Sequence, residues 1–392
     1  MSGTLQDVYI VSAVRTPIAA FRGSFAAVGP VELGAVVSKE ALSRAGVKPE
    51  DVEETVAGSV LTAGQGQNVA RQIALKAGVP EHRNAYTVNK VCSSSLKALI
   101  LASQSIQLGC RNTCLVVGVE SMSQTPFYLA RGEHGYGEVK LADGIQRDGI
   151  SDAILNEAMG MCAEKTVKDY KFTRQQQDEY ALSSYERAAN AWKNGDYKAE
   201  VVPVSVKQRR GPDVVVAEDE EYKRLLKEKV PTLPTAFVKD GTGTITAANA
   251  SSLNDGAAAV VVVSGKVTKP AKPLAKVVAY AEGGRAPVDF TVAPVNAVLT
   301  LLETAGIPKE KVSRWEINEA FSVTALAFIK ELGLDRNTVN ARGGAVALGH
   351  PIGMSGARIV VTLVHQLNPG EYGVAAICNG GGEATALLVQ RC

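Results

Sequence analysis

The sequence predicts an α/β protein built from two similar halves. Three observations lead to this prediction. Short apolar runs typical of buried strands alternate with segments whose apolar residues recur at helical spacing. Glycine is abundant, with 37 residues, as expected for a fold with many tight turns. The second half also resembles the first at a constant offset. Strands that alternate with helices predict a largely parallel sheet covered on both faces.

The first half of the chain contains a regular series of predicted elements. Val8–Val14 is typical of a buried strand, and Val31–Ala45 of a helix that ends at Gly46. The remaining predicted elements are a strand over Asp51–Val60, a helix over Gln67–Ala77, a strand over Ala85–Val91, a helix over Leu96–Leu108 and a strand over Cys114–Val119.

The second half repeats this pattern when residue n is aligned with residue n+260. Ala45-Gly46-Val47 then aligns with Ala305-Gly306-Ile307, and Ser95 aligns with Ser355. One offset holds for about seventy residues, which favours a duplicated unit over chance. Duplicated halves can bring equivalent strand ends to one crevice, where ligands of such sheets bind.

Residues 121–246 are richer in charged and polar side chains, and we interpret them as an inserted loop domain that covers the crevice. They include a predicted helix over Gln175–Lys193, with its N-terminus near Thr173 and its end at Gly195. The predicted division is therefore an N-terminal half over 1–120 with 247–270, a loop domain over 121–246, and a C-terminal half over 271–392.

The bulk composition excludes several classes of function. A net charge of +2 gives no general attraction to nucleic acid or to anionic membranes. No apolar run reaches the roughly 20 residues of a membrane span, and the N-terminus has no signal-peptide pattern, so we expect a cytoplasmic protein. The even number of cysteines, six, therefore does not imply disulfides, and Cys110 and Cys114 have no histidine nearby to form a zinc site.

Cys92 is the first candidate catalytic residue because it lies where a predicted strand passes into a predicted helix. The first amides of a helix lack partners, and the helix dipole there favours negative charge. We therefore expect a thiolate with a lowered pKa, which makes cysteine a usable nucleophile. The alternative is a small buried thiol that fills a gap between helix and sheet.

Three further candidates lie at predicted strand ends in the second half. His350 belongs to a glycine-rich stretch over 343–356, Cys378 precedes three more glycines, and Asn318 follows another strand. Each has an ordinary structural alternative: a hydrogen-bonded histidine, a core thiol and a helix N-cap. The duplication would place all three beside Cys92, which favours a shared pocket.

These motifs resemble those of the thiolase family. The stretches Asn89–Ser95, Asn318–Phe321, Gly349–Arg358 and Cys378–Gly382 are similar to its signatures, and the resemblance extends over essentially the whole chain. It implies the thiolase fold, with two βαβαβαββ halves and a loop domain. Among thiolases, the chain looks most similar to the biosynthetic members that join two acetyl-CoA molecules into acetoacetyl-CoA.

The resemblance also implies a role for each catalytic residue. Cys92, activated by His350, would carry the acetyl group, and Cys378 would remove the α-proton of the second acetyl-CoA. Asn318 would hold a water that stabilises the enolate together with His350. The backbone amides of Cys92 and Gly380 would form the second oxyanion hole, a kind of site whose individual donors are worth about 3–4 kcal/mol.

Coenzyme A contacts are implied by position in the same way. The residues concerned are Ser251, Met159, Ala320, Phe321, Tyr185, Arg224 and Lys229. For Arg224 and Lys229 the alternative is an ordinary solvated charge. Ala158 departs from the family pattern, in which many members have histidine.

No prosthetic group is implied, but a potassium site and a homotetramer are. The potassium ligands would come from Tyr185, Ala247, Ala248, Ala250 and Val346, four of them through backbone carbonyls. The tetramer would form through the loop domain. The implied partners are acetyl-CoA, acetoacetyl-CoA and CoA.

Three other functions were weighed. A degradative 3-ketoacyl-CoA thiolase would have the same catalytic set and a longer acyl channel. A β-ketoacyl-carrier-protein synthase would need His or Asn in place of Cys378. A non-catalytic acyl-CoA or lipid carrier would retain the fold without turnover.

Overall fold

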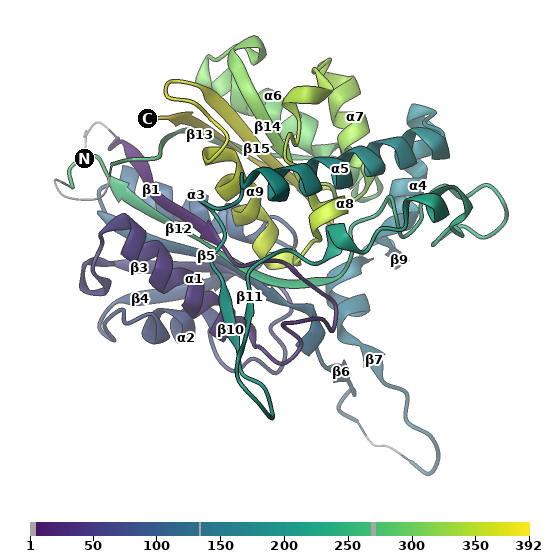
Figure 1. Cartoon of the computed structure of the whole chain (residues 1–392), viewed down its shortest axis with the longest axis horizontal. Helices are drawn as coiled ribbons and strands as arrows, with labels where there is room; N and C mark the ends of the chain where they lie inside the picture. Colours follow the sequence, from purple (N-terminus) through teal and green to yellow (C-terminus); the bar gives the residue numbers. More distant parts are fainter. Residues whose placement is uncertain (1–4, 133–134, 268–271) are drawn as a thin grey trace.

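A computed structural model describes residues 5–132, 135–267 and 272–392 (Figure 1). Its main feature is a ten-stranded sheet. The strands of this sheet are β1 (Val8–Arg15), β2 (Ala19–Ala20), β3 (Glu54–Gly58), β4 (Asn84–Val88), β5 (Thr113–Ser121), β12 (Asn254–Ser264), β13 (Ala275–Gly284), β14 (Val312–Ile317), β15 (Tyr372–Asn379) and β16 (Glu383–Arg391). Their order is β14-β15-β16-β13-β1-β12-β5-β3-β4, and β2 pairs with β12.

The sheet is symmetric about its central pair, β1 and β13. These strands are antiparallel, with Val8 opposite Val277 and Ile10 opposite Ala275. On either side the equivalent strands follow in the same order: β12 and β16, then β5 and β15, then β3 and β14. This arrangement confirms the predicted duplication.

The prediction of a largely parallel sheet is wrong. Only the pairs of β3 with β4, β3 with β5 and β14 with β15 are parallel, and the other recorded pairs in this sheet are antiparallel. The central strands are covered by helices on both faces, so they are apolar throughout whichever way they run. A continuous apolar run therefore did not reveal strand direction.

Helices cover the two faces in separate layers. They are α1 (Pro30–Ala45), α2 (Val69–Lys76), α3 (Ser94–Gln107), α4 (Met159–Tyr170), α5 (Arg174–Asn194), α6 (Ala293–Ala305), α7 (Ser322–Leu332), α8 (Ala345–Leu348) and α9 (Ser355–Val364). Helices α1 and α2 cover one face of the N-terminal half, and α6 and α7 cover the equivalent face of the C-terminal half.

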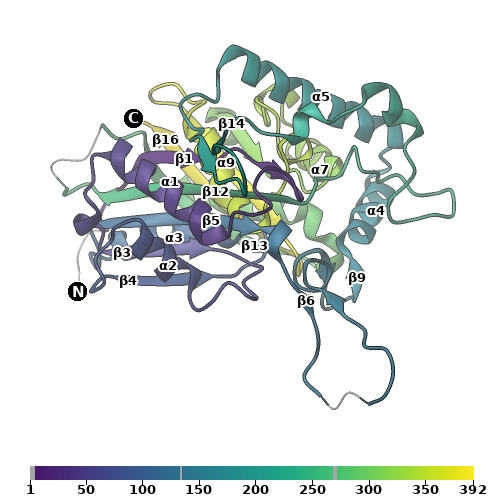
Figure 2. The same cartoon turned by 60° about the horizontal axis from the view of Figure 1, so that its bottom comes forward.

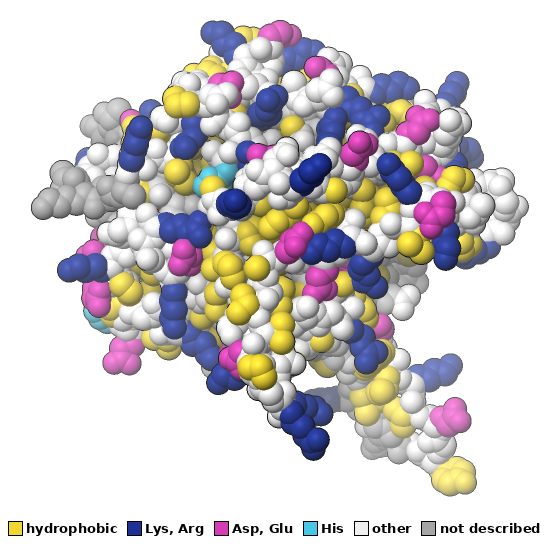
Figure 3. Space-filling model, viewed as in Figure 1, with side chains coloured by type: hydrophobic (Ala, Val, Ile, Leu, Met, Phe, Trp, Pro, Cys, Tyr) yellow, Lys and Arg dark blue, Asp and Glu magenta, His cyan; other side chains and the backbone are white. Residues whose placement is uncertain are grey.

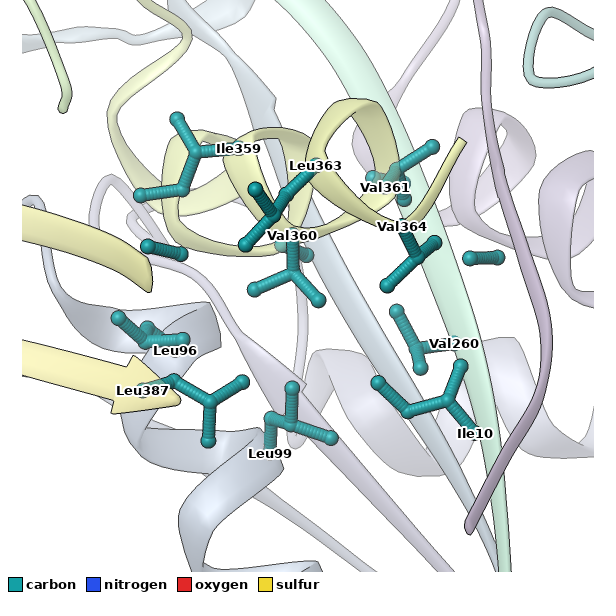
Figure 4. Close-up of a cluster of buried hydrophobic side chains, with 14 of the residues drawn as sticks. Ile10, Leu96, Leu99, Val260, Ile359, Val360, Val361, Leu363, Val364 and Leu387 are labelled. Carbon is teal, nitrogen blue, oxygen red and sulfur yellow. The ribbon is translucent and has the colours of Figure 1, made fainter. Parts of the chain in front are cut away.

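The middle layer consists of α3 and α9. Leu96 and Leu99 of α3 and Val360 and Val364 of α9 share one buried cluster with Ile10 of β1 (Figure 4). In β5, Val116 faces this cluster whereas its neighbours face the outer cluster under α1, as the alternation of strand side chains requires.

The C-terminal half is not a complete copy of the first. Where the N-terminal half has strand β4, the C-terminal half has only an isolated parallel bridge between Trp315 and Val339. The duplicated pattern therefore holds for the strands that reach the site and weakens at the outer edge.

The segment between the halves contains an arm, two helices and short hairpins. Its strands are β6 (Phe127–Tyr128), β7 (Ala142–Asp143), β8 (Ser151–Asp152), β9 (Glu157–Ala158), β10 (Val204–Val206) and β11 (Val214–Val216). The arm that carries β6 and β7 projects from the body in both views (Figures 1 and 2). Helix α5 begins at a capping box of Thr173 and Gln176 and ends at Gly195 in the left-handed conformation, as predicted.

The predicted boundary between residues 270 and 271 lies outside the described residues, as do residues 1–4 of the predicted N-terminal half. One described segment, Pro287–Ala305, is long and apolar enough to cross a membrane. It packs on β13 and β16 and is 56% buried, which is the environment of a core helix.

Arg15 joins the N-terminal half to the intervening segment through buried ion pairs. Its guanidinium contacts Glu200 and Asp219, each at 2.7 Å, and all three side chains are fully buried. The guanidinium also lies 4.9 Å from the centre of the Tyr197 ring. Removing one member of such a cluster leaves a buried charge without a partner.

We predict that Arg15→Met lowers the free energy of unfolding by about 3–5 kcal/mol, because two buried carboxylates lose their cation. Lys76→Met is the control: its pair with Glu32 is half exposed, so the cost should stay below about 1 kcal/mol. Urea denaturation of both variants provides the measurement. Equal losses in the two variants would contradict this role for Arg15.

Candidate active site

A pocket of about 600 Å³ lies where the two halves and the intervening segment meet. Eight of the predicted site residues line it: Cys92, Met159, Ala250, Ser251, Ala320, Phe321, His350 and Gly380. They come from segments far apart in the sequence, and the lining is mainly apolar. Pockets of this kind, with a few polar groups among apolar walls, are typical of binding sites for small molecules and cofactors.

Cys92 lies on a tight turn between β4 and α3. The predicted strand to Val91 in fact ends at Val88, because Val91 adopts a positive φ of 49° that no regular strand allows. The backbone N–H of Lys90 donates to Ser94 Oγ at 2.9 Å. This turn holds Cys92 at the pocket wall just before the helix begins.

The expected lowering of the Cys92 pKa is wrong. Burial raises the pKa to about 12, although the backbone N–H groups of Gly380 and Cys92 itself point at the sulfur and favour the thiolate. Desolvation therefore exceeds the effect of the two amides. Those amides converge on one point, as an oxyanion hole requires.

His350 is held at both its backbone and its ring. Its backbone N–H donates to Asn254 Oδ1 at 3.0 Å, and its Nδ1 lies 2.5 Å from Ser355 Oγ. Its Nε2 is buried with no hydrogen-bond partner among the described residues. Burial, together with the charge of Arg358, lowers the pKa to about 3, so the resting imidazole is neutral.

Asn318 directly follows strand β14, and Cys378 is the last residue but one of β15, the neighbouring parallel strand. The Asn318 backbone N–H donates to Ala376 O at 3.0 Å, while its buried side-chain amide has no partner among the described residues. Cys378 is buried in an apolar cluster with Met159 and Phe321. Burial raises the pKa of its thiol well above the usual value, and the nearby Cys92 raises it further.

Two loops of the pocket wall are tied together at Ala320. Its carbonyl accepts the backbone N–H of Ser251 at 3.0 Å and the Ser251 hydroxyl at 2.9 Å. Ala250 and Phe321 pair in an isolated bridge beside this contact. Ser251 therefore fixes the relative position of two predicted substrate-binding segments.

Eight predicted residues are not among those that line the pocket. They are Asn318, Cys378, Tyr185, Arg224, Lys229, Ala247, Ala248 and Val346. Arg224 is exposed and pairs with Glu221 at 3.2 Å. Tyr185 is partly buried near Glu221 and Glu319, and both burial and these carboxylates raise its pKa.

Several residues that shape the site were not singled out from the sequence. Ile145 and Ile150 line the pocket from the predicted loop domain, and no periodicity marks them. Glu120 is buried, and its carboxylate accepts backbone N–H groups of Val60, Leu61 and Gly353 at 2.8–3.1 Å. The only sequence signal for Glu120 was its place at the end of a buried strand.

The sequence and the geometry agree with one family of enzymes. Residues 8–266 match the thiolase N-terminal domain, and residues 271–391 match the thiolase C-terminal domain. The chain therefore belongs to the thiolase family. It is 50% identical to the mitochondrial acetyl-CoA acetyltransferase of Mus musculus over 390 residues, which cover 99% of this chain and 92% of that protein.

Solved structures show the same relationship. A crystal structure of the Acat5 thiolase from Ascaris suum in complex with coenzyme A is 58% identical, with a TM-score of 0.96 over 99% of this chain and 100% of that one. Human mitochondrial 3-ketoacyl-CoA thiolase is 33% identical, with a TM-score of 0.94 over 100% of both chains. The predicted fold is confirmed.

Proposed function

We propose that this thiolase is an acetyl-CoA C-acetyltransferase that converts two molecules of acetyl-CoA into acetoacetyl-CoA and CoA, reversibly, through acetyl-Cys92. The protein is thus an acyltransferase. The observation that carries the proposal is the convergence of Cys92, His350 and the Gly380 amide on one pocket, with Cys378 packed against that pocket's wall.

In the first half-reaction, the Cys92 thiol gives its proton to Nε2 of His350, and the sulfur attacks the thioester carbon. The carbonyl oxygen becomes negative and accepts the N–H groups of Cys92 and Gly380, which already point at the sulfur. Each such donor is worth about 3–4 kcal/mol in comparable sites. The CoA thiolate then leaves and takes up the proton of Cys378, so that Cys378 becomes a thiolate, His350 keeps the proton of Cys92, and Cys92 stays acetylated.

In the second half-reaction, Cys378 removes the α-proton of a second acetyl-CoA. The resulting carbanion attacks the acetyl carbon on Cys92, and Cys92 leaves as a thiolate that recovers its proton from His350, while Cys378 keeps the α-proton and is again a thiol. The enolate oxygen needs donors, which His350 and a water on Asn318 supply. The buried side-chain amide of Asn318 has no partner within the described part of the chain, which supports this role because buried polar groups are usually hydrogen-bonded.

Coenzyme A lies with its pantetheine arm along Met159, Ser251, Ala320 and Phe321, all of which line the pocket. We assign the nucleotide end to Arg224 and Lys229, which are both exposed, with Tyr185 beside Arg224. Cationic side chains are suited to phosphate recognition.

A 3-ketoacyl-CoA thiolase of broader chain length is the second candidate. It is favoured by the apolar cluster of Met122, Ile145 and Ile352 that packs against Cys92. Relative kcat/KM for acetoacetyl-CoA and for longer 3-ketoacyl-CoAs separates the two. An acyl-CoA carrier would bind the substrates and fail to release acetyl when CoA is added.

We infer a homotetramer formed through the projecting arm. The arm exposes Phe127, Leu129, Tyr136, Val139 and Leu141, and apolar side chains are visible along it in Figure 3. Exposed apolar groups gathered on one element indicate a protein interface. Light scattering that gives the mass of a monomer would contradict this assembly.

We also infer a potassium site near Tyr185, with carbonyls of Ala247, Ala248, Ala250 and Val346. The nearby carboxylates of Glu221 and Glu319 support it, because they make the surroundings of Tyr185 negative. Oxygen ligands suit such hard cations. Equal activity and melting temperature in sodium and potassium buffers would exclude the site.

The finer division of the chain and its compartment are proposals too. We retain three parts over 1–120 with 247–270, 121–246 and 271–392, supported by the separate outer cores of the two halves. We propose a cytoplasmic location as the alternative to the mitochondrial one in the names of curated relatives. Limited proteolysis and cell fractionation test these two proposals.

The central prediction is an acetyl group on Cys92. Mixing the protein with acetyl-CoA should add one acetyl group, found on the Cys92 peptide by mass spectrometry and removed by CoA. Cys92→Ser should abolish it, and Cys110→Ser, at an exposed cysteine, should not. Acetylation that survives in Cys92→Ser would reject the proposal.

A second prediction separates the two thiols. Cys378→Ala should still form acetyl-Cys92, while exchange of the acetyl-CoA α-proton with deuterated solvent should fall by at least 100-fold, because the base is missing. Cys162→Ala is the matched control, since Cys162 is a buried cysteine in the same cluster. Exchange retained in Cys378→Ala would show that another group is the base.

A further inference from the structure

Ser355, the first residue of α9, has a buried hydroxyl between two groups of the His350 loop. Its Oγ lies 2.5 Å from Nδ1 of His350 and 2.9 Å from the carbonyl oxygen of Pro351. A hydroxyl has one proton and can donate only once. When it donates to Pro351, it must accept from Nδ1, and the imidazole then carries its proton there.

The opposite arrangement is less favourable in this site. If Ser355 donated to Nδ1, the ring proton would lie on Nε2, which is buried and has no acceptor among the described residues. A buried N–H without a partner costs free energy. With the proton on Nδ1, Nε2 instead carries a lone pair. A general base needs such a lone pair to accept a proton.

We propose that Ser355 is a positioning residue that holds neutral His350 in the Nδ1–H tautomer, so that Nε2 can accept the proton of Cys92. The inference rests on the proposed role of His350. In catalysis, the proton that reaches Nε2 creates an imidazolium, and its Nδ1–H then donates to Ser355 as a stronger, charge-assisted bond. The burial of His350 and the charge of Arg358 disfavour the charged imidazolium. Ser355 opposes both effects, because its hydroxyl stabilises that charged form.

The chain offers a matched control in Ser103. Its buried hydroxyl donates to the carbonyl oxygen of Leu99, four residues earlier, at 2.8 Å. The Ser355 hydroxyl likewise donates to the carbonyl oxygen of Pro351, four residues earlier. Ser103 belongs to α3, which packs on α9, and its hydroxyl bonds a backbone carbonyl rather than a titratable side chain. Removing either hydroxyl costs one helix-backbone bond, and only Ser355→Ala removes the partner of His350.

The tautomer can be read directly from ring-¹⁵N NMR of protein labelled at histidine. The chain has four histidines, and the His350 signals are assigned by their loss in His350→Gln. Wild-type protein should show a protonated Nδ1 and an unprotonated Nε2. A protonated Nε2 in the wild type would overturn the inference, and this test needs no variant at Ser355.

In rapid-quench assays, Ser355→Ala should form acetyl-Cys92 about 100- to 1,000-fold more slowly, as expected when the base is held in the wrong tautomer. KM should change less than threefold, and the NMR signals should shift toward protonated Nε2. Ser103→Ala should keep the wild-type rate and tautomer. An acetylation rate in Ser355→Ala within threefold of that in Ser103→Ala would overturn the inference.

The proposed function fails in a different way. Wild-type protein that forms no acetyl-Cys92 would reject that function itself.

Discussion

The close packing of α3 on α9 at their first turns determines where the reactive groups lie. A Cβ on Gly356 would come within 2.5 Å of the backbone nitrogen of Leu96, so only glycine allows this approach. The Ala357 N–H donates to Ser95 Oγ at 2.8 Å across the same contact. The loops that precede the two helices carry Cys92 and His350. Joining the helices at these ends therefore brings the nucleophile and its base to one pocket, although 258 residues of chain separate them.

The pocket keeps its reactive side chains neutral before the reaction and stabilises the negative charge that forms on the substrate oxygen during it. Burial keeps the Cys92 thiol protonated and the His350 imidazole neutral, with pKa values raised to about 12 and lowered to about 3. An ion pair formed in the resting enzyme would stabilise the ground state and not the transition state. The fixed amides of Cys92 and Gly380 act on the oxygen that becomes negative when the thioester is attacked. Because they are backbone groups, they need no reorganisation at that moment.

The sequence predicted the site well where a single residue carries out the chemistry. It predicted poorly the features that depend on packing by many residues. Cys92 and His350 lie in short motifs next to predicted helices, and the offset of 260 residues correctly paired Ser95 with Ser355 at the two helix starts. The stretch Gly349–Arg358 also contains Ser355, but the sequence does not reveal that the Ser355 hydroxyl lies next to Nδ1 of His350. Strand direction and the Cys92 pKa were wrongly predicted, because both depend on what surrounds an apolar segment on all sides. Wall residues such as Ile145 come from a segment without periodicity, and only tertiary packing places them at the pocket.

Asn254 shows why neither half could contain a working site alone. Its side-chain oxygen accepts the His350 N–H, and its side-chain nitrogen donates to Ala19 O at 3.0 Å and to Glu221 Oε1 at 3.3 Å. One buried amide thus connects the C-terminal half, the N-terminal half and the intervening segment. Glu221 in turn pairs with Arg224, which we assign to the nucleotide end of coenzyme A. The position of the base therefore depends on contacts from all three parts of the chain. A duplicated fold can accordingly evolve an asymmetric site, because the asymmetry lies in the loops while the paired strands and helices hold the frame.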